Sequence, residues 1–333
     1  MNAIAAELRR FFRRRSTWVV TLVAVLLALL LGAAQWYAQR PPLPEDQAMM
    51  EQLYQQEKAN WDQNKESIIQ QCLIDEALNR QVDPSYVADC SEAALMPTRE
   101  MYGHVPPEFF VGWQDMQTMT VPPMAFFLVL IAVATFIGAE FASGNIGTLL
   151  TFESRRTRVY LSKLFACVLG SVFIFVVWNI AAAGASALSV LLNQGTFVLP
   201  DGYLIDHLLL PLGWTAAAVA GVGLAVGAVT VVLRRTIGVL GLAMGYLIVG
   251  ESMVPGLVPL VGQYTLYNNV NALIQGEWMY RAMECGINET THTYDCSTTL
   301  FPITRVWAAQ ELGGLVLFCL IVGWLVFRRR DVT

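Results

Sequence analysis

Six long apolar runs divide the chain, and each is long enough to form a helix that crosses a lipid bilayer. About 20 apolar residues, at a rise of 1.5 Å per residue, cover a hydrocarbon core of about 30 Å. We expect these helices at residues 17–37, 121–141, 160–192, 208–233, 236–253 and 304–327. The first run is too long for a cleaved signal peptide, and no clean small-x-small site follows it. The pattern therefore predicts an all-α polytopic membrane protein with six transmembrane helices.

Residues 1–16, before the first run, have the pattern of an amphipathic helix. Ile4, Leu8, Phe11 and Phe12 fall on one helical stripe, and arginines cover the other side. Such a helix lies in the plane of the membrane interface. We therefore expect an interfacial elbow helix that leads into the first span. The alternative is a positively charged flank with no separate role.

The two longest polar segments are residues 38–117 and 254–303. The first is rich in Gln and Glu, and its stretch 46–80, low in Gly and Pro, is typical of a helix. It ends in an amphipathic stretch near 109–116. The second begins with Pro255 and Pro259 in an apolar stretch that is too broken for a straight span. Irregular backbone at membrane depth needs protein cover. We therefore predict a helical outer domain at 38–117, and re-entrant or interfacial helices within an outer loop at 254–303.

The positive charges fix the expected topology. Fourteen of the 21 basic residues occupy four segments: Arg9, Arg10, Arg13, Arg14 and Arg15; Arg155, Arg156, Arg158 and Lys163; Arg234 and Arg235; and Arg328, Arg329 and Arg330. Short loops rich in Lys and Arg stay in the cytoplasm. Both termini and the loop at 142–158 are thus expected to be cytoplasmic. The net charge of −5 comes from the outer segments, and no basic patch suggests binding to nucleic acid.

Four of the six cysteines form two local pairs in the expected outer segments. Because these segments lie on the oxidising side, we predict the disulfides Cys72–Cys90 and Cys285–Cys296. The alternatives are four free thiols, or a zinc site with His104 or His292. The histidine spacing matches no metal pattern. Cys167 and Cys319 lie within apolar runs, where an inert thiol is expected.

The loop between the second and third runs, GAEFASGNIGTLLTFESRRTRVYLSKL, has the richest pattern in the chain. Glu140 lies near the membrane boundary, where it could pair with Arg155 or Arg156. Ser143, Gly144 and Asn145 supply turn and capping chemistry. Ile146, Leu149 and Leu150 would give a short helix an apolar face, which a cytoplasmic partner could grip. An ordinary positively charged loop is the alternative.

This order of residues resembles the coupling loop of ABC-type-2 exporter permeases. The resemblance rests on Gly138-x-Glu140, a small polar turn, Leu-Leu-Thr, Ser-Arg-Arg and Lys-Leu. It extends in layout to the elbow helix, the six spans and the broken segment after the fifth. It implies a permease subunit that forms the translocation path in a bacterial plasma membrane. It also implies docking of two separate ABC ATPase subunits, through Glu140, Asn145, Ile146, Leu149, Leu150, Glu153, Arg155, Arg156, Arg234 and Arg235. A second copy, or a similar permease, would complete the path.

The chain itself has no phosphate-binding loop, because none of its lysines follows a glycine. We therefore expect no cofactor and no enzyme activity in this chain, with ATP and Mg²⁺ in the partner subunit. Polar residues inside spans are functional candidates by default. Asn179, Glu251, Gln310 and Glu311 are the candidates for the translocation path, although either carboxylate could simply reach outer water.

The cargo expected from apolar, aromatic-rich walls is hydrophobic or amphipathic: a drug, an antibiotic peptide or a lipid. Two other classes of function remain open. One is an ATP-independent secondary transporter or channel, which would need inverted repeats and mid-bilayer charges. The other is a membrane-anchored sensor or assembly protein whose outer domain binds a ligand.

Overall fold

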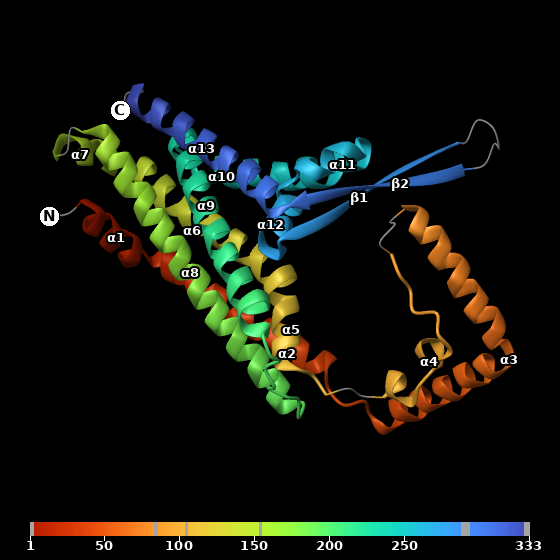
Figure 1. Ribbon diagram of the computed structural model, residues 1–333. Helices are drawn as coiled ribbons and strands as arrows, with labels where there is room; N and C mark the ends of the chain where they lie inside the picture. The colour runs from red at the N-terminus through yellow and green to blue at the C-terminus, as the bar shows by residue number, and fades with distance from the viewer. Residues whose placement is uncertain (1–2, 83–85, 104–105, 153–154, 288–293, 330–333) are drawn as a thin grey trace.

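The computed structural model describes residues 3–82, 86–103, 106–152, 155–287 and 294–329 (Figure 1). Six of the described helical stretches are long and apolar enough to cross a membrane. They are Arg15–Ala38, Phe109–Ala142, Arg156–Leu192, Leu204–Leu233, Thr236–Leu257 and Arg305–Arg329. The chain thus has the character of a multi-pass membrane protein, and its six spans lie where the apolar runs predict them.

The bundle is built around α6 (Val121–Ala142), α8 (Arg156–Leu192) and α9 (Leu210–Leu233). Helix α2 (Arg15–Ala38) runs along α8, and α13 (Arg305–Arg329) runs along α9. The buried core includes Val129, Phe136, Ile174 and Trp178. Small residues allow close approach of these helices. At Gly223 of α9, for example, an added Cβ would overlap the Ser171 side chain of α8.

Helix α1 (Ala3–Arg13) is fixed to the bundle instead of lying free on its surface. The Phe11 ring is fully buried and meets the Phe136 ring of α6 edge to face, at 5.1 Å. It fills a notch at Gly170 of α8, where any Cβ would overlap it. Thr17 donates a hydrogen bond of 2.8 Å to the Phe11 carbonyl and holds the turn into α2. One residue of the expected lipid-facing stripe therefore faces the protein.

At one end of the bundle, Figure 1 shows α1, α7 (Asn145–Phe152) and the C-terminus. At the other end lies α5 (Phe109–Asp115), which runs into α6 through the π-helical segment Met116–Thr120. The stretch expected as a separate surface helix near 109–116 is thus the beginning of the second span. A second π-helical segment, Leu204–Leu209, likewise runs into α9.

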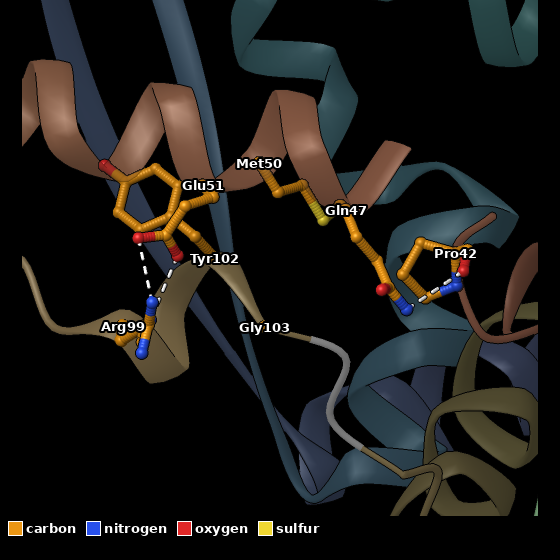
Figure 2. A pocket seen from close by; sticks show the side chains of 7 residues that line it. All are labelled: Pro42, Gln47, Met50, Glu51, Arg99, Tyr102 and Gly103. Atoms are coloured by element: carbon orange, nitrogen blue, oxygen red, sulfur yellow. Dashed lines mark hydrogen bonds and ion pairs between the residues drawn. The ribbon is translucent and has the colours of Figure 1, made fainter. Parts of the chain in front are cut away.

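Beyond this second end projects a helical unit made of α3 (Pro44–Val82), α4 (Glu92–Leu95) and the 3₁₀ turn Arg99–Tyr102. A disulfide joins Cys72 to Cys90. A hollow of about 260 Å³ lies where the start of α3 meets the 3₁₀ turn. Figure 2 shows the residues that line it. There Arg99 donates two hydrogen bonds, of 3.0 and 2.9 Å, to the Glu51 carboxylate. These bonds from Arg99, helped by one from Gln55, lower the pKa of Glu51.

The fifth span and the segment that follows it contain both helices and strands. Helix α10 (Thr236–Gly245) continues through a π-helical segment, Tyr246–Met253, to α11 (Val254–Leu257). The 3₁₀ turn Pro259–Tyr264 and α12 (Leu266–Gln275) follow. Strands β1 (Glu277–Ile287) and β2 (Tyr294–Thr304) then form an antiparallel hairpin. The all-α prediction is therefore wrong for this segment.

Alternating side chains explain why these residues form strands. Trp278 and Tyr280 are partly buried and Ala282 is fully buried, whereas Met279 and Arg281 between them are exposed. A period of two places alternate residues on one face of a strand. Ile303 lies opposite Trp278 in the register and is also buried. One face of the hairpin is thus buried near Glu277 and Thr304, where the strands begin and end. The alternation of buried and exposed residues is the sequence signal for these strands, and a search for long apolar runs does not detect it.

Candidate functional site

The loop between α6 and α8 folds as the short helix α7, as the sequence pattern predicts. Gly144 turns the chain with a φ of +70°, a conformation that side chains with a Cβ rarely adopt. Ile146 then points into the bundle and is 1% exposed, while Leu149 packs partly against the same core. Asn145, Thr148 and Thr151 are exposed. The apolar face expected to meet a partner is thus partly turned inward, and the exposed face is polar.

Two of the expected contact residues lie beyond this description. The Leu150 side chain and all of Glu153 fall outside the described residues. Arg155 is exposed and immediately precedes α8. Arg156 begins α8 and donates a hydrogen bond of 3.2 Å to the Arg328 carbonyl oxygen. The basic end of this loop is therefore tied to the end of α13.

A buried cluster of charges joins α1, α6 and α8. Glu140, near the end of α6, and Lys163, in the second turn of α8, form an ion pair. Lys163 also reaches Glu7 of α1 at 3.1 Å, and Glu140 reaches Arg14 at 3.1 Å. The side chains of Glu7, Glu140 and Lys163 are all less than 5% exposed. Buried charges are tolerated only when paired in this way.

This cluster replaces the pairing expected for Glu140. Its carboxylate is bound to Lys163 and Arg14, whereas Arg156 donates a hydrogen bond to the Arg328 carbonyl oxygen. Glu7 and Lys163 were not among the expected partners of Glu140. The sequence holds a signal for both, because Glu7 is the single acidic residue before Glu45 and Lys163 lies within the apolar run at 160–192. Each needs an opposite charge once it is buried.

The loop between α9 and α10 contacts the last turn of α6. Arg234 has a φ of +56°, and its guanidinium group lies 5.6 Å from the centre of the Phe141 ring at the end of α6. This is a cation–π arrangement. Arg235 is exposed. The loop at Arg234 and Arg235 thus lies next to the end of α6, from which the loop that contains α7 starts.

The four polar candidates within the spans do not form a common site. Asn179 of α8 is buried and accepts a hydrogen bond of 2.6 Å from Gln117, which leads into α6. Glu251 accepts a hydrogen bond of 3.2 Å from the Tyr267 amide, at the first turn of α12. A carboxylate at that end complements the helix dipole. Asn179 and Glu251 therefore hold helices together.

Gln310 and Glu311 differ from the first two candidates, because both are exposed on α13. Their helix has only 11% of its most apolar stretch buried. A carboxylate in a span is costly unless it faces water, a cavity or another protein surface. The face of α13 that carries these two polar side chains is therefore expected to contact water or another protein surface instead of lipid alone.

Of the two expected disulfides, the structure describes one. The sulfur atoms of Cys72 and Cys90 are bonded, with the Cα atoms 5.8 Å apart. The register of the hairpin places Cys285 directly opposite Cys296. The side chains of this second pair lie outside the described residues. Cys167 is a buried free thiol, and Cys319 is a partly exposed one.

Comparison of the sequence with family models and with curated proteins identifies no relative of this chain. No family model matches the sequence. No curated protein matches it either. The function therefore has to be inferred from the pattern of the sequence and from the geometry described above.

Proposed function

We propose that this chain is the permease subunit of an ATP-driven ABC exporter, which forms the translocation path and couples to separate ATPase subunits through α7. The observation that carries the proposal is the position of α7 in the bundle. This short helix connects α6 to α8, and the buried ion pair between Glu140 and Lys163 joins these two spans near the ends that α7 links. A force applied to α7 would be passed directly to α6 and α8.

The distribution of charge supports the orientation. Arg155, Arg235 and the basic residues of α1 lie with α7 at one end of the bundle, which the positive-inside rule assigns to the cytoplasm. The α3 unit and the hairpin then lie outside a bacterial plasma membrane, where the Cys72–Cys90 disulfide is stable. In this orientation α1 is the elbow helix and both termini are cytoplasmic.

The exposed faces of α10 and α13 favour a second permease subunit. Only 6% of the most apolar stretch of Thr236–Leu257 is buried. Its Gly241 and Gly245, four residues apart, have open space where a Cβ would lie, an arrangement that suits close helix packing. Gln310 and Glu311 of α13 would line the path between two copies, or between this chain and a similar permease. The cargo that suits such walls is a hydrophobic or amphipathic drug, antibiotic peptide or lipid.

The residues of α7 that could contact a partner are those whose side chains are exposed. The exposed residues Asn145, Thr148 and Thr151, with Arg155 and Arg235 beside them, would contact the ATPase subunits, in which ATP and Mg²⁺ bind. Ile146 would keep α7 rigid from within, since its side chain is already buried.

Gentle purification of the tagged chain from its native host tests this proposal. We expect an ATPase subunit to be recovered in equal amount with the wild-type chain, and to be lost from the Thr148→Arg variant. The Thr299→Arg variant is the matched control, because Thr299 is an exposed threonine of the hairpin. A chain that is recovered without any ATPase would refute the proposal and favour a secondary transporter or a sensor. Equal loss from both variants would refute the role of α7.

A further inference from the structure

Helix α1 carries a hollow on its surface that the proposed export function does not use. The hollow has a volume of about 370 Å³ and is lined by Leu8, Arg9, Phe12 and Arg13. These residues are one helical turn apart in two pairs, so the two arginines lie along one side and the two apolar residues along the other. Both arginine side chains are exposed.

The arginines of this region divide into two groups by their partners. Arg10 is paired with Glu7 at 3.1 Å, and Arg14 is paired with Glu140 at 3.1 Å. Within the described part of the chain, Arg9 and Arg13 have no acidic partner. Arg15 likewise has no acidic partner among the described residues, so two of the three uncompensated arginines line the hollow. An anion would be attracted to them.

The hollow is also rigid, because α1 cannot roll about its axis. Phe11 on the opposite side is fully buried, and Glu7 is held by Lys163 within the bundle at 3.1 Å. The backbone of Arg9 and Arg13 is therefore held in place, and both side chains start from fixed positions on the exposed side of α1. A site that is formed before the ligand arrives loses less entropy on binding.

An apolar surface leads directly away from the hollow. The Phe12 ring meets the Phe173 ring of α8 edge to face at 5.0 Å, and Trp18 donates a hydrogen bond of 2.8 Å to the Phe12 carbonyl oxygen. Trp18 and Leu22 of the first span are then 55% and 59% exposed. An acyl chain could lie along this face while its head group remains between the arginines.

We infer that this hollow binds the head group of an anionic phospholipid. Arg9 and Arg13 donate hydrogen bonds to the phosphate oxygens, and Leu8 and Phe12 pack against the glycerol backbone and the first carbons of the acyl chains. Arginine suits this role because its planar donors match a phosphate group. A free phosphate ion would use the arginines but would gain nothing from Leu8, Phe12 and Trp18. The inference does not depend on the proposed function.

Native mass spectrometry of the full chain in detergent tests this site. The probes are phosphatidylglycerol and phosphatidylcholine with identical acyl chains, added at equal concentrations. We expect phosphatidylglycerol to be retained preferentially. The Arg9→Gln and Arg13→Gln variants should each weaken its retention by about fivefold, since one basic side chain near an anionic lipid contributes roughly 1 kcal/mol. Equal retention of the two lipids by the wild-type chain would overturn the inference.

Matched variants separate this site from general charge attraction. Arg15→Gln removes the same charge two residues beyond the hollow, and it should leave retention unchanged. The Arg9→Lys/Arg13→Lys variant should keep most of the preference and shows that α1 still folds. A loss in Arg15→Gln as large as that in Arg9→Gln would overturn the inference. So would complete displacement of the lipid by millimolar inorganic phosphate, which would make the hollow a small-anion site.

Discussion

Replacement of Lys163 by Met gives the sharpest test of the cluster below α7. The substitution keeps the length of the side chain but removes its charge, and it leaves Glu7 and Glu140 buried. Glu7 would keep Arg10, whose side chain is 46% exposed, and Glu140 would keep Arg14, whose side chain is 22% exposed. Both carboxylates would therefore depend on partners that water screens more strongly.

The size of the effect follows from the contacts. A pair of unit charges 3.1 Å apart, as Lys163 and Glu7 are, interacts by about 5 kcal/mol at an effective dielectric constant of 20. The Lys163→Met variant does not bury an ammonium group, so its folding free energy gains back a few kcal/mol of desolvation penalty. The carboxylates of Glu7 and Glu140 remain buried and still carry their own penalty. Loss of one partner from a buried pair costs about 3–5 kcal/mol of folding free energy. We expect a loss in this range.

Reversible unfolding in mixed micelles would measure this loss. The control is Lys65→Met, because the pair of Lys65 with Glu92 has side chains that are 47% and 61% exposed, and such a surface pair contributes less than about 1 kcal/mol. Adding Glu140→Gln and Glu7→Gln to Lys163→Met should restore most of the stability. A loss below about 1 kcal/mol for Lys163→Met, equal to that of the control, would show that the cluster is not a buried charge network.

Three further predictions concern other parts of the chain. The Cys72→Ala/Cys90→Ala variant should lose about 3 kcal/mol of stability in the α3 unit, because the disulfide spans 18 positions, and protease cleavage there should become faster while the spans stay protected. Lowering the pH should release the 3₁₀ turn from α3. The pKa of Glu51 lies below its ordinary value of 4.5 in the folded chain, so the bond to Arg99 contributes fully above pH 4.5 and is lost as the pH falls through the lowered pKa. The protection of the amides of the turn, measured relative to their intrinsic exchange rate at each pH, should therefore fall in acid, and Glu51→Gln should make that protection independent of pH. Finally, Gly170→Val should expel helix α1 from its notch and speed its amide exchange, whereas Gly184→Val, in open space on the same helix, should not; equal effects would contradict the notch.

The positions of the spans followed from the sequence because transfer from water to lipid depends on composition and length alone. Each run needs no partner to become a membrane helix, since a helix satisfies its own backbone hydrogen bonds. The closeness of Cys72 and Cys90 was similarly a local property. The base of the hairpin could also have been found locally, from the period of two at Trp278, Tyr280 and Ala282.

The pairing of charges depended on the tertiary structure. Lys163 meets Glu140 across 23 positions and Glu7 across 156, and no local pattern relates residues so far apart. Arg155 and Arg156 were nearer to Glu140 in sequence, yet Glu140 is paired with Lys163 and Arg14. The same holds for Ile146, which has the spacing of an exposed apolar face but is drawn against the bundle. Composition determines which residues must leave water, whereas helix packing decides which surface each of them meets.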